Sequence, residues 1–238
     1  MSDSNVGLIL YLPLDEIKDG MVLDQTDNDN DGTLNGQPQL VPDETFGSCV
    51  SFDGIDDYVD LPPESCPQGN EITVSFWANG ASALPSDSSA ISALDPNGGR
   101  VLNIHLPWYD SQIYFDCGYD SNGVDTIKKP AQASDFKGRW THWAFTKNAA
   151  TGEMKIYLDG LLWHSGKGLT KPLMAAYFTL GAFGKSGSYY PGKLRPGSWA
   201  ACSPYRASRS LSASTTGSAR MPNISDVRSS ACFIIICP

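Results

Sequence analysis

The chain has 238 residues, of which 41% are hydrophobic and 18% are charged, with 26 Asp and Glu against 17 Lys and Arg. This composition excludes a disordered chain. The net charge of −9 argues against nucleic acid as a partner, because an acidic surface repels phosphate backbones. The length suits one large β domain, and the sequence lacks the run of about 18 apolar residues that a transmembrane helix needs.

The N-terminus predicts a strand at residues 7–14 and shows no signal peptide, because the residues before it lack a basic region and the apolar run is short. An acidic loop follows, in which Gly32 closes a D-x-D-x-D-G pattern and is expected to take the left-handed conformation. Carboxylates on a tight turn suit calcium. The predicted calcium ligands are Asp27, Asp29, Asp31 and Thr33.

This loop is not an EF-hand, because Pro38 stands where the bidentate Glu would be. A calcium site would need further ligands, and the nearby candidates are Asp24, Asp53, Asp56 and Asp57. The alternative is a solvated Asx-rich turn that is held by its own hydrogen bonds.

Alternation of apolar and polar residues predicts short strands through the rest of the body. Asp159-Gly160 separates two of them and is typical of a two-residue hairpin turn. The predicted strands cover residues 48–52, 58–61, 71–78, 101–106, 112–117, 139–147, 153–158, 161–164 and 177–183. Many short strands with Gly- and Pro-rich turns, and no convincing helix, predict an all-β fold: a two-sheet antiparallel β-sandwich.

Six segments carry a family resemblance in sequence order, namely residues 30–36 (NDGTLNG), 50–59 (VSFDGIDDYV), 72–77 (ITVSFW), 140–146 (WTHWAFT), 154–160 (MKIYLDG) and 178–181 (FTLG). Together they resemble laminin-G-like, concanavalin A-like jelly rolls. The resemblance implies one jelly-roll domain over residues 6–194. It also implies a binding module outside the cell or at the cell surface, with calcium-assisted glycan recognition as the expected role. The alternative role is a protein–protein adhesion module.

Catalysis is not expected. Glucanases of this fold carry E-x-D-x-x-E on one strand, and Glu153 is followed by Met154 and Lys155 instead. A glycoside hydrolase is therefore the less favoured function. The three histidines, His105, His142 and His164, have no metal-binding spacing, and His142 is expected to be a structural residue.

Aromatic residues near loops are candidates for glycan contact, because exposed rings stack on the C–H faces of sugars while carboxylates and amides bind the hydroxyls. The predicted ligand-binding residues are Trp108, Tyr109, Asp110, Tyr119, Asp120 and Asn122, with Asp116 as a further member of the same platform. Tyr189 and Tyr190 also lie near a loop. The alternative for each ring is ordinary partial burial.

The composition changes after Gly192, where six basic residues accompany a single acid, Asp226. The family's closing strand starts at residue 190, but Arg195 and Pro196 interrupt it, and proline cannot donate to a central ladder. We therefore expect residues 195–238 to form an irregular Ser/Arg-rich tail, either a frame-shifted or mis-spliced end or a natural disordered tail. A foreign tail would leave the fold without its last strand and expose a sheet edge.

Six cysteines include three in the body, Cys49, Cys66 and Cys117, and none form a C-x-x-C pair. Buried free thiols are the favoured prediction for these three, because Cys is among the most buried residue types. One disulfide among them is the alternative.

Overall fold

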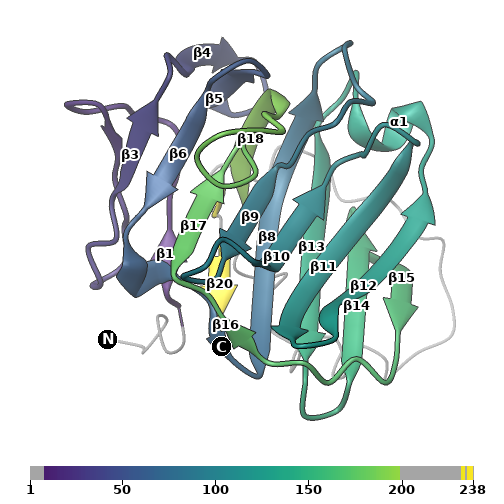
Figure 1. The fold of residues 1–238 in the computed structure, drawn as a ribbon. Coiled ribbons are helices and arrows are strands. Elements are labelled where there is room, and N and C mark those ends of the chain that lie inside the picture. Colours follow the sequence, from purple (N-terminus) through teal and green to yellow (C-terminus); the bar gives the residue numbers. More distant parts are fainter. Residues whose placement is uncertain (1–7, 199–231, 234, 238) are drawn as a thin grey trace, which may run out of the picture.

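Two large antiparallel sheets face each other in the computed structural model of the chain, which describes residues 8–198, 232–233 and 235–237 (Figure 1). The helical elements of these residues are a 3-10 turn, η1 (Pro63–Ser65), and one short helix, α1 (Ala133–Phe136). Within the described ranges, neither is long or apolar enough to cross a bilayer. The predicted all-β fold class is confirmed.

The first sheet, called sheet A, has the strand order β15-β14-β13-β8-β18-β5-β4. Its strands are β4 (Gln39–Asp43), β5 (Gly47–Asp53), β8 (Glu71–Gly80), β13 (Thr141–Asn148), β14 (Glu153–Leu158), β15 (Leu161–Gly166) and β18 (Pro191–Ser198). Three further short strands belong to sheet A but stand outside this linear order: β1 (Leu10–Tyr11), β19 (Cys232–Phe233) and β20 (Ile235–Cys237).

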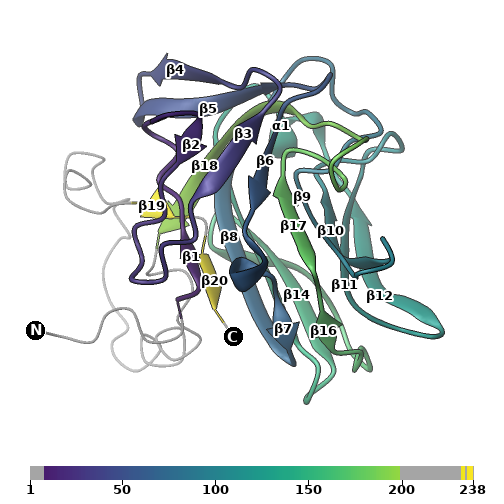
Figure 2. The same cartoon turned by 60° about the vertical axis from the view of Figure 1, so that its left-hand side comes forward.

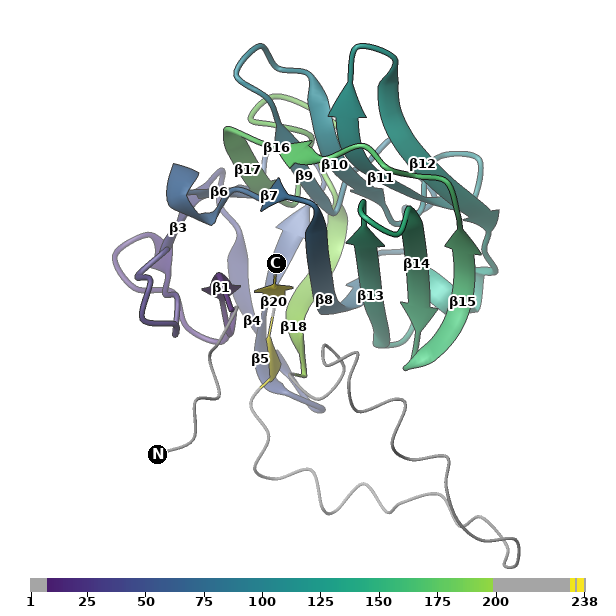
Figure 3. The same cartoon turned by 90° about the horizontal axis from the view of Figure 1, so that it is seen from below.

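The second sheet, called sheet B, has the order β12-β11-β10-β9-β17-β6-β3-β2 and packs across sheet A (Figure 3). Its strands are β2 (Met21–Val22), β3 (Gly32–Asn35), β6 (Tyr58–Leu61), β9 (Ile91–Leu94), β10 (Arg100–His105), β11 (Gln112–Asp120), β12 (Gly123–Pro130) and β17 (Tyr177–Leu180). A small separate pair joins β7 (Gln68–Gly69) to β16 (Leu173–Met174).

The core lies between the two sheets and is filled by the inward residues of each strand. Phe76 and Phe145 stack within sheet A, with ring centroids 5.9 Å apart. Phe115 of sheet B meets Phe145 at 5.3 Å, so the two sheets share one aromatic core. Because side chains alternate along a strand, their neighbours on β8, β11 and β13 face outward.

The predicted body strands are confirmed, with end shifts of a few residues, except at the two ends of the body. Residues 7–14 yield only β1, while Leu12 and Leu14 are buried outside any strand. The sequence prediction missed β4, β9 and β12, and in β12 the buried Asp125 puts a charge at an inward position. It also took residues 30–36 as a turn, whereas β3 begins at Gly32.

β18 corrects the expectation for the C-terminal end, because it continues past residue 194 and lies in the middle of sheet A. It pairs with β5 as far as Leu194 and with β8 as far as Pro196. The edge that a missing last strand would expose is therefore covered in this structure. Residues 199–231, which make up most of the predicted tail, lie outside the described residues.

The three body cysteines are free and buried, which confirms the favoured prediction. Burial raises the pKa of the Cys66 thiol to about 11, and it also raises the pKa values of Cys49 and Cys117. Thiolate forms are therefore scarce at neutral pH.

Candidate functional site

The N-terminal acidic loop is organised around the buried carboxylate of Asp24. One of its oxygens accepts from the amides of Tyr11 and Thr26, at 2.8 and 3.1 Å. The other accepts from the Thr26 hydroxyl at 2.7 Å and from the amide of Asn30 at 2.9 Å. Four donors thus occupy the carboxylate that was the nearest candidate for an additional calcium ligand.

The predicted calcium ligands lie around this loop without converging. Asp27, Asp29 and Thr33 are exposed, and Asp31 accepts a 2.7 Å hydrogen bond from the amide of Asp24. The left-handed residue of the turn is Asp29, with φ 52°, whereas Gly32 is extended in β3. This arrangement has the features of an Asx-rich turn. The calcium site remains a prediction.

A tighter group of carboxylates lies in the turn between β5 and β6. Oxygens of Asp53, Asp56 and Asp57 come within 4.8 Å of one another, and among the described residues this is the group close enough to share a cation. Asp57 is buried and accepts from the amides of Gln37 and Asp53, at 2.7 and 3.0 Å. Because those amides hold the carboxylate, a turn role accounts for the group.

The turn between β10 and β11 presents two of the predicted aromatic residues to solvent. Tyr109 is 67% exposed, and the half-buried Trp108 lies beside it with ring centroids 5.5 Å apart. Trp108 in turn covers the ring of the buried His105 at 4.1 Å. The turn is closed by two 2.9 Å bonds, from the Trp108 amide to Gln112 and from the Ser111 amide to Trp108. The rings are therefore held by a packed base.

Asp110 completes this surface with a fixed carboxylate. It accepts from the Tyr114 hydroxyl at 2.8 Å and from the backbone and side-chain nitrogens of Gln112. Partial burial opposes ionisation, but the hydrogen bonds from Tyr114 and Gln112 outweigh it and lower the pKa of Asp110. Lys128 places its ammonium 4.8 Å from the centre of the Tyr114 ring.

We call these five residues, Trp108, Tyr109, Asp110, Tyr114 and Lys128, the loop platform. The sequence analysis missed Tyr114 and Lys128. Their signal was present, because Tyr114 alternates with the core residue Phe115 and so faces outward. Lys128 is directly opposite Tyr114 in the ladder of β11 and β12.

The other predicted ligand residues lie at the far end of β11 and do not join this platform. Trp108 is bonded to Gln112 at the start of β11, and Tyr119 lies seven residues further along, so Tyr119, Asp120 and Asn122 stand roughly 25 Å from Trp108. Asp120 forms a 3.0 Å ion pair with Lys171 and caps the turn by accepting from the amide of Asn122. The single platform expected from the sequence is thus two separate surfaces, because an extended strand separates its two ends.

Asp116 and Tyr190 also differ from expectation. Asp116 is buried, pairs with Arg100 at 2.5 Å and accepts from the Thr126 hydroxyl at 2.6 Å, so it braces sheet B. Tyr190 is fully buried, and that burial raises the pKa of its phenol.

The buried histidines have structural environments. His142 lies 2.9 Å from the Ser75 hydroxyl, and burial lowers its pKa to about 4. His105 is held between the Ser88 carbonyl at 2.7 Å and the Asn103 amide at 2.8 Å. Each imidazole is thus neutral at pH 7, and the structural role expected for His142 fits its contacts.

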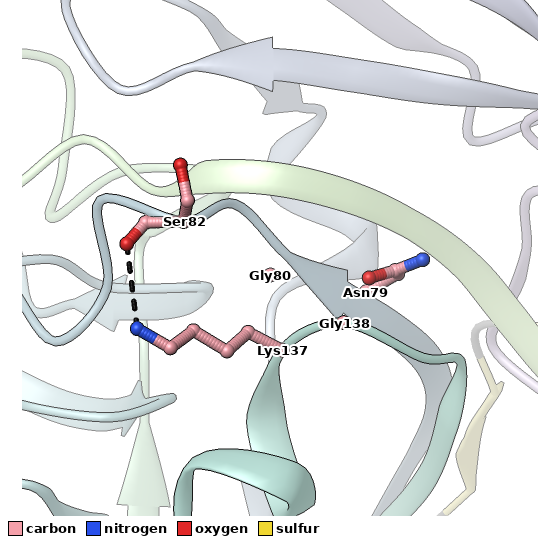
Figure 4. Close-up of a pocket in the computed structure, with 5 residues that line it drawn as sticks. All are labelled: Asn79, Gly80, Ser82, Lys137 and Gly138. Carbon is pink, nitrogen blue, oxygen red and sulfur yellow. Dashed lines mark hydrogen bonds between the residues drawn. The ribbon is translucent and has the colours of Figure 1, made fainter.

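A depression of about 370 Å³ opens where β8 ends, lined by Asn79, Gly80, Ser82, Lys137 and Gly138 (Figure 4). The Lys137 ammonium donates to the carbonyls of Ser82, at 3.3 Å, and Leu84, at 2.5 Å. Figure 4 shows this side chain reaching toward Ser82 while Asn79 points the other way. The lysine ties the loop after β8 to the segment after α1, which accounts for its position.

Comparison with known protein families assigns the chain to one of them. The sequence profile described as the concanavalin A-like lectin/glucanases superfamily matches residues 53–196, which is more than half of the chain. The chain belongs to this superfamily. The resemblance drawn from the six sequence segments is thereby confirmed. A comparison with curated protein sequences gives no match.

Solved structures share the fold of this superfamily member at low sequence identity. Domain 4 of AbnA, a GH43 extracellular arabinanase from Geobacillus stearothermophilus solved with arabinotriose, aligns with a TM-score of 0.60 and 19% identity, covering 79% of this chain and 89% of that one. The receptor binding domain of the botulinum neurotoxin C/D mosaic serotype aligns with a TM-score of 0.60 and 15% identity. The botulinum serotype D ligand binding domain, solved with N-acetylneuraminic acid, gives 0.62 and 16%.

The chain spans just under half of these toxin domains. The alignments cover 80% of this chain but 48% of the C/D mosaic domain and 46% of the serotype D domain. The match to the arabinanase domain covers most of both chains, so that domain is the more useful comparison of size.

Proposed function

We propose that the chain is a non-catalytic module that binds carbohydrate outside the cell through the loop platform. The observation that carries this proposal is the exposed Tyr109 ring, adjacent to Trp108 and to the ionised, immobilised Asp110. Rings offer a stacking face, and the carboxylate accepts from sugar hydroxyls. The arabinanase domain, which shares this fold and was solved with arabinotriose, supports a carbohydrate ligand.

The test is a glycan array followed by titration calorimetry of the best ligand, in calcium and in EDTA. The substitution Tyr109→Ala removes the exposed ring, and we expect it to weaken binding at least tenfold. Tyr119→Ala is the matched control, because Tyr119 is 41% exposed at the other end of β11. Calcium assistance is a subordinate part of the proposal, and equal affinities in both buffers would remove it.

Protein–protein adhesion is the second candidate, and one observation favours it. Leu161 and Leu162 are 75% and 57% exposed on the edge strand β15, an apolar pair that suits a protein partner. An array without binding, together with a protein partner whose capture is lost in Leu161→Ser, would favour adhesion over glycan recognition.

A further inference from the structure

Sheet A is completed along β8 by two separate segments of the chain. β18 pairs with the second half of β8, from Gly80 opposite Gly192 to Phe76 opposite Pro196. Proline has no N–H to donate, and the ladder between β18 and β8 ends at Pro196. Gly197 and Ser198 pair with β19 instead. The part of β8 that precedes Phe76 in sequence, residues 73–75, is therefore free of β18 and open to pairing with another strand.

β20 fills that edge and is flanked on both sides. Ile235, Ile236 and Cys237 pair with Ser75, Val74 and Thr73 of β8. On its other side, Ile236 and Ile235 pair with Leu10 and Tyr11 of β1. Figures 2 and 3 both show β20 lying between β1 and β8. Among the described strands, β20 is the one with which β1 forms a ladder.

We propose that the space between β1 and β8, bounded by Leu10–Tyr11 and Thr73–Ser75, is an acceptor slot for an extended apolar peptide strand. The chain's own residues 235–237 occupy it, and the same segment of a second copy can replace them. Backbone groups on both sides supply the affinity in strand addition. Leu10 and Val74 are fully buried and face the same position, so an incoming strand needs an apolar residue there.

The resident strand is suited to exchange because it is short and separate. It has three residues, whereas β18 has eight, of which residues 191–194 pair with β5 and residues 192–196 pair with β8. Residues 199–231 separate the two strands in sequence, so the resident segment competes through its effective concentration. Exchange of one identical element between copies gives a symmetric dimer.

The experiment uses the full chain and a fluorescent peptide with the sequence of residues 232–238, in which serine replaces both cysteines. Ile236→Pro in the protein removes one donor of the resident strand and opens the slot. We expect the peptide to bind this variant at least tenfold more tightly than the wild type, measured by fluorescence anisotropy. The control is the same peptide with proline at the position of residue 236, which should not bind either protein.

Equal binding to wild type and variant, or equal binding of both peptides, would overturn the proposal. Hydrogen exchange on the wild-type chain keeps it testable should the variant not fold. The amides of Leu10 and β20 should exchange together and at least tenfold faster than Gly192–Leu194 of β18. Protection of β20 equal to that of β18 would show a permanently closed sheet and reject the exchangeable slot.

Discussion

At the scale of single residues, His142 gives the fold a pH dependence. Its pKa is about 4 in the folded protein, against 6.5 for an ordinary histidine, because burial disfavours the cation. Between these two values the unfolded chain binds more protons than the native one, so stability falls as the pH is lowered. The slope is about 1.4 kcal/mol per pH unit for one such group. We expect urea unfolding at pH 7 and pH 5 to show this loss, and His142→Gln to reduce it.

The matched control for that change is His164→Gln. His164 is only half-buried, so its imidazole stays partly in contact with water, and burial lowers its pKa. His164→Gln should leave the dependence of the unfolding free energy on pH nearly as in the wild type. If His142→Gln kept the full slope, the dependence would have to come from another group, of which the buried His105 is the next candidate.

At the scale of elements, Gly32 decides how closely β3 approaches its neighbours. A Cβ placed on it would lie 2.5 Å from Val59 and 3.0 Å from Val22. We therefore expect Gly32→Ala to reduce the free energy of unfolding by about 1–3 kcal/mol, the usual cost of overpacking. Gly187→Ala is the control, because a Cβ there meets nothing within 4 Å. Chemical denaturation of both variants measures the difference, and equal stabilities would contradict the steric argument.

At the scale of the whole molecule, a buried ion pair joins the two sheets. Lys147 of β13 contacts Asp125 of β12 at 2.7 Å and donates to the Cys117 carbonyl at 2.7 Å. Asp125→Asn would leave a buried ammonium without its counter-charge, and we expect a loss of about 3–5 kcal/mol in urea unfolding. The double change Lys147→Met, Asp125→Leu should recover most of it.

A surface pair provides the comparison for this prediction. Lys185 and Asp60 are 2.6 Å apart and partly exposed to solvent, so Lys185→Met should cost less than about 1 kcal/mol. A loss of similar size in both cases would mean that burial does not govern the contribution of the Lys147–Asp125 pair.

The fold was predictable from sequence wherever alternation was clean. β8 and β13 follow the apolar–polar pattern and pair in register from Thr141 opposite Ala78. β12 was missed because Asp125 puts a charge at an inward position, which only its tertiary pairing with Lys147 satisfies. Gly32 was assigned to a turn because its motif has that chemistry, while the reason for a glycine there is the packing of Val59.

The candidate site was predictable only in part. Trp108, Tyr109 and Asp110 were recognised as loop residues with suitable chemistry, and they lie together. Their separation from Tyr119 depends on the length of β11, which strand prediction placed three residues short, at residue 117. Tyr114 joins the platform through the hydrogen bond of its hydroxyl to Asp110, a contact that sequence spacing does not specify.

Because β18 lies in the middle of sheet A, this sheet can be assembled only late in synthesis. Val50 pairs with Leu194, and Leu10 pairs with Ile236, so sheet A joins the beginning of the chain to its end. Such distant pairings make folding slow, because loop-closure entropy is lost before the contacts form. During synthesis β4 and β5 cannot join β8 until residues 191–198 have left the ribosome. The apolar inner faces of these early strands therefore stay available to chaperones for most of translation.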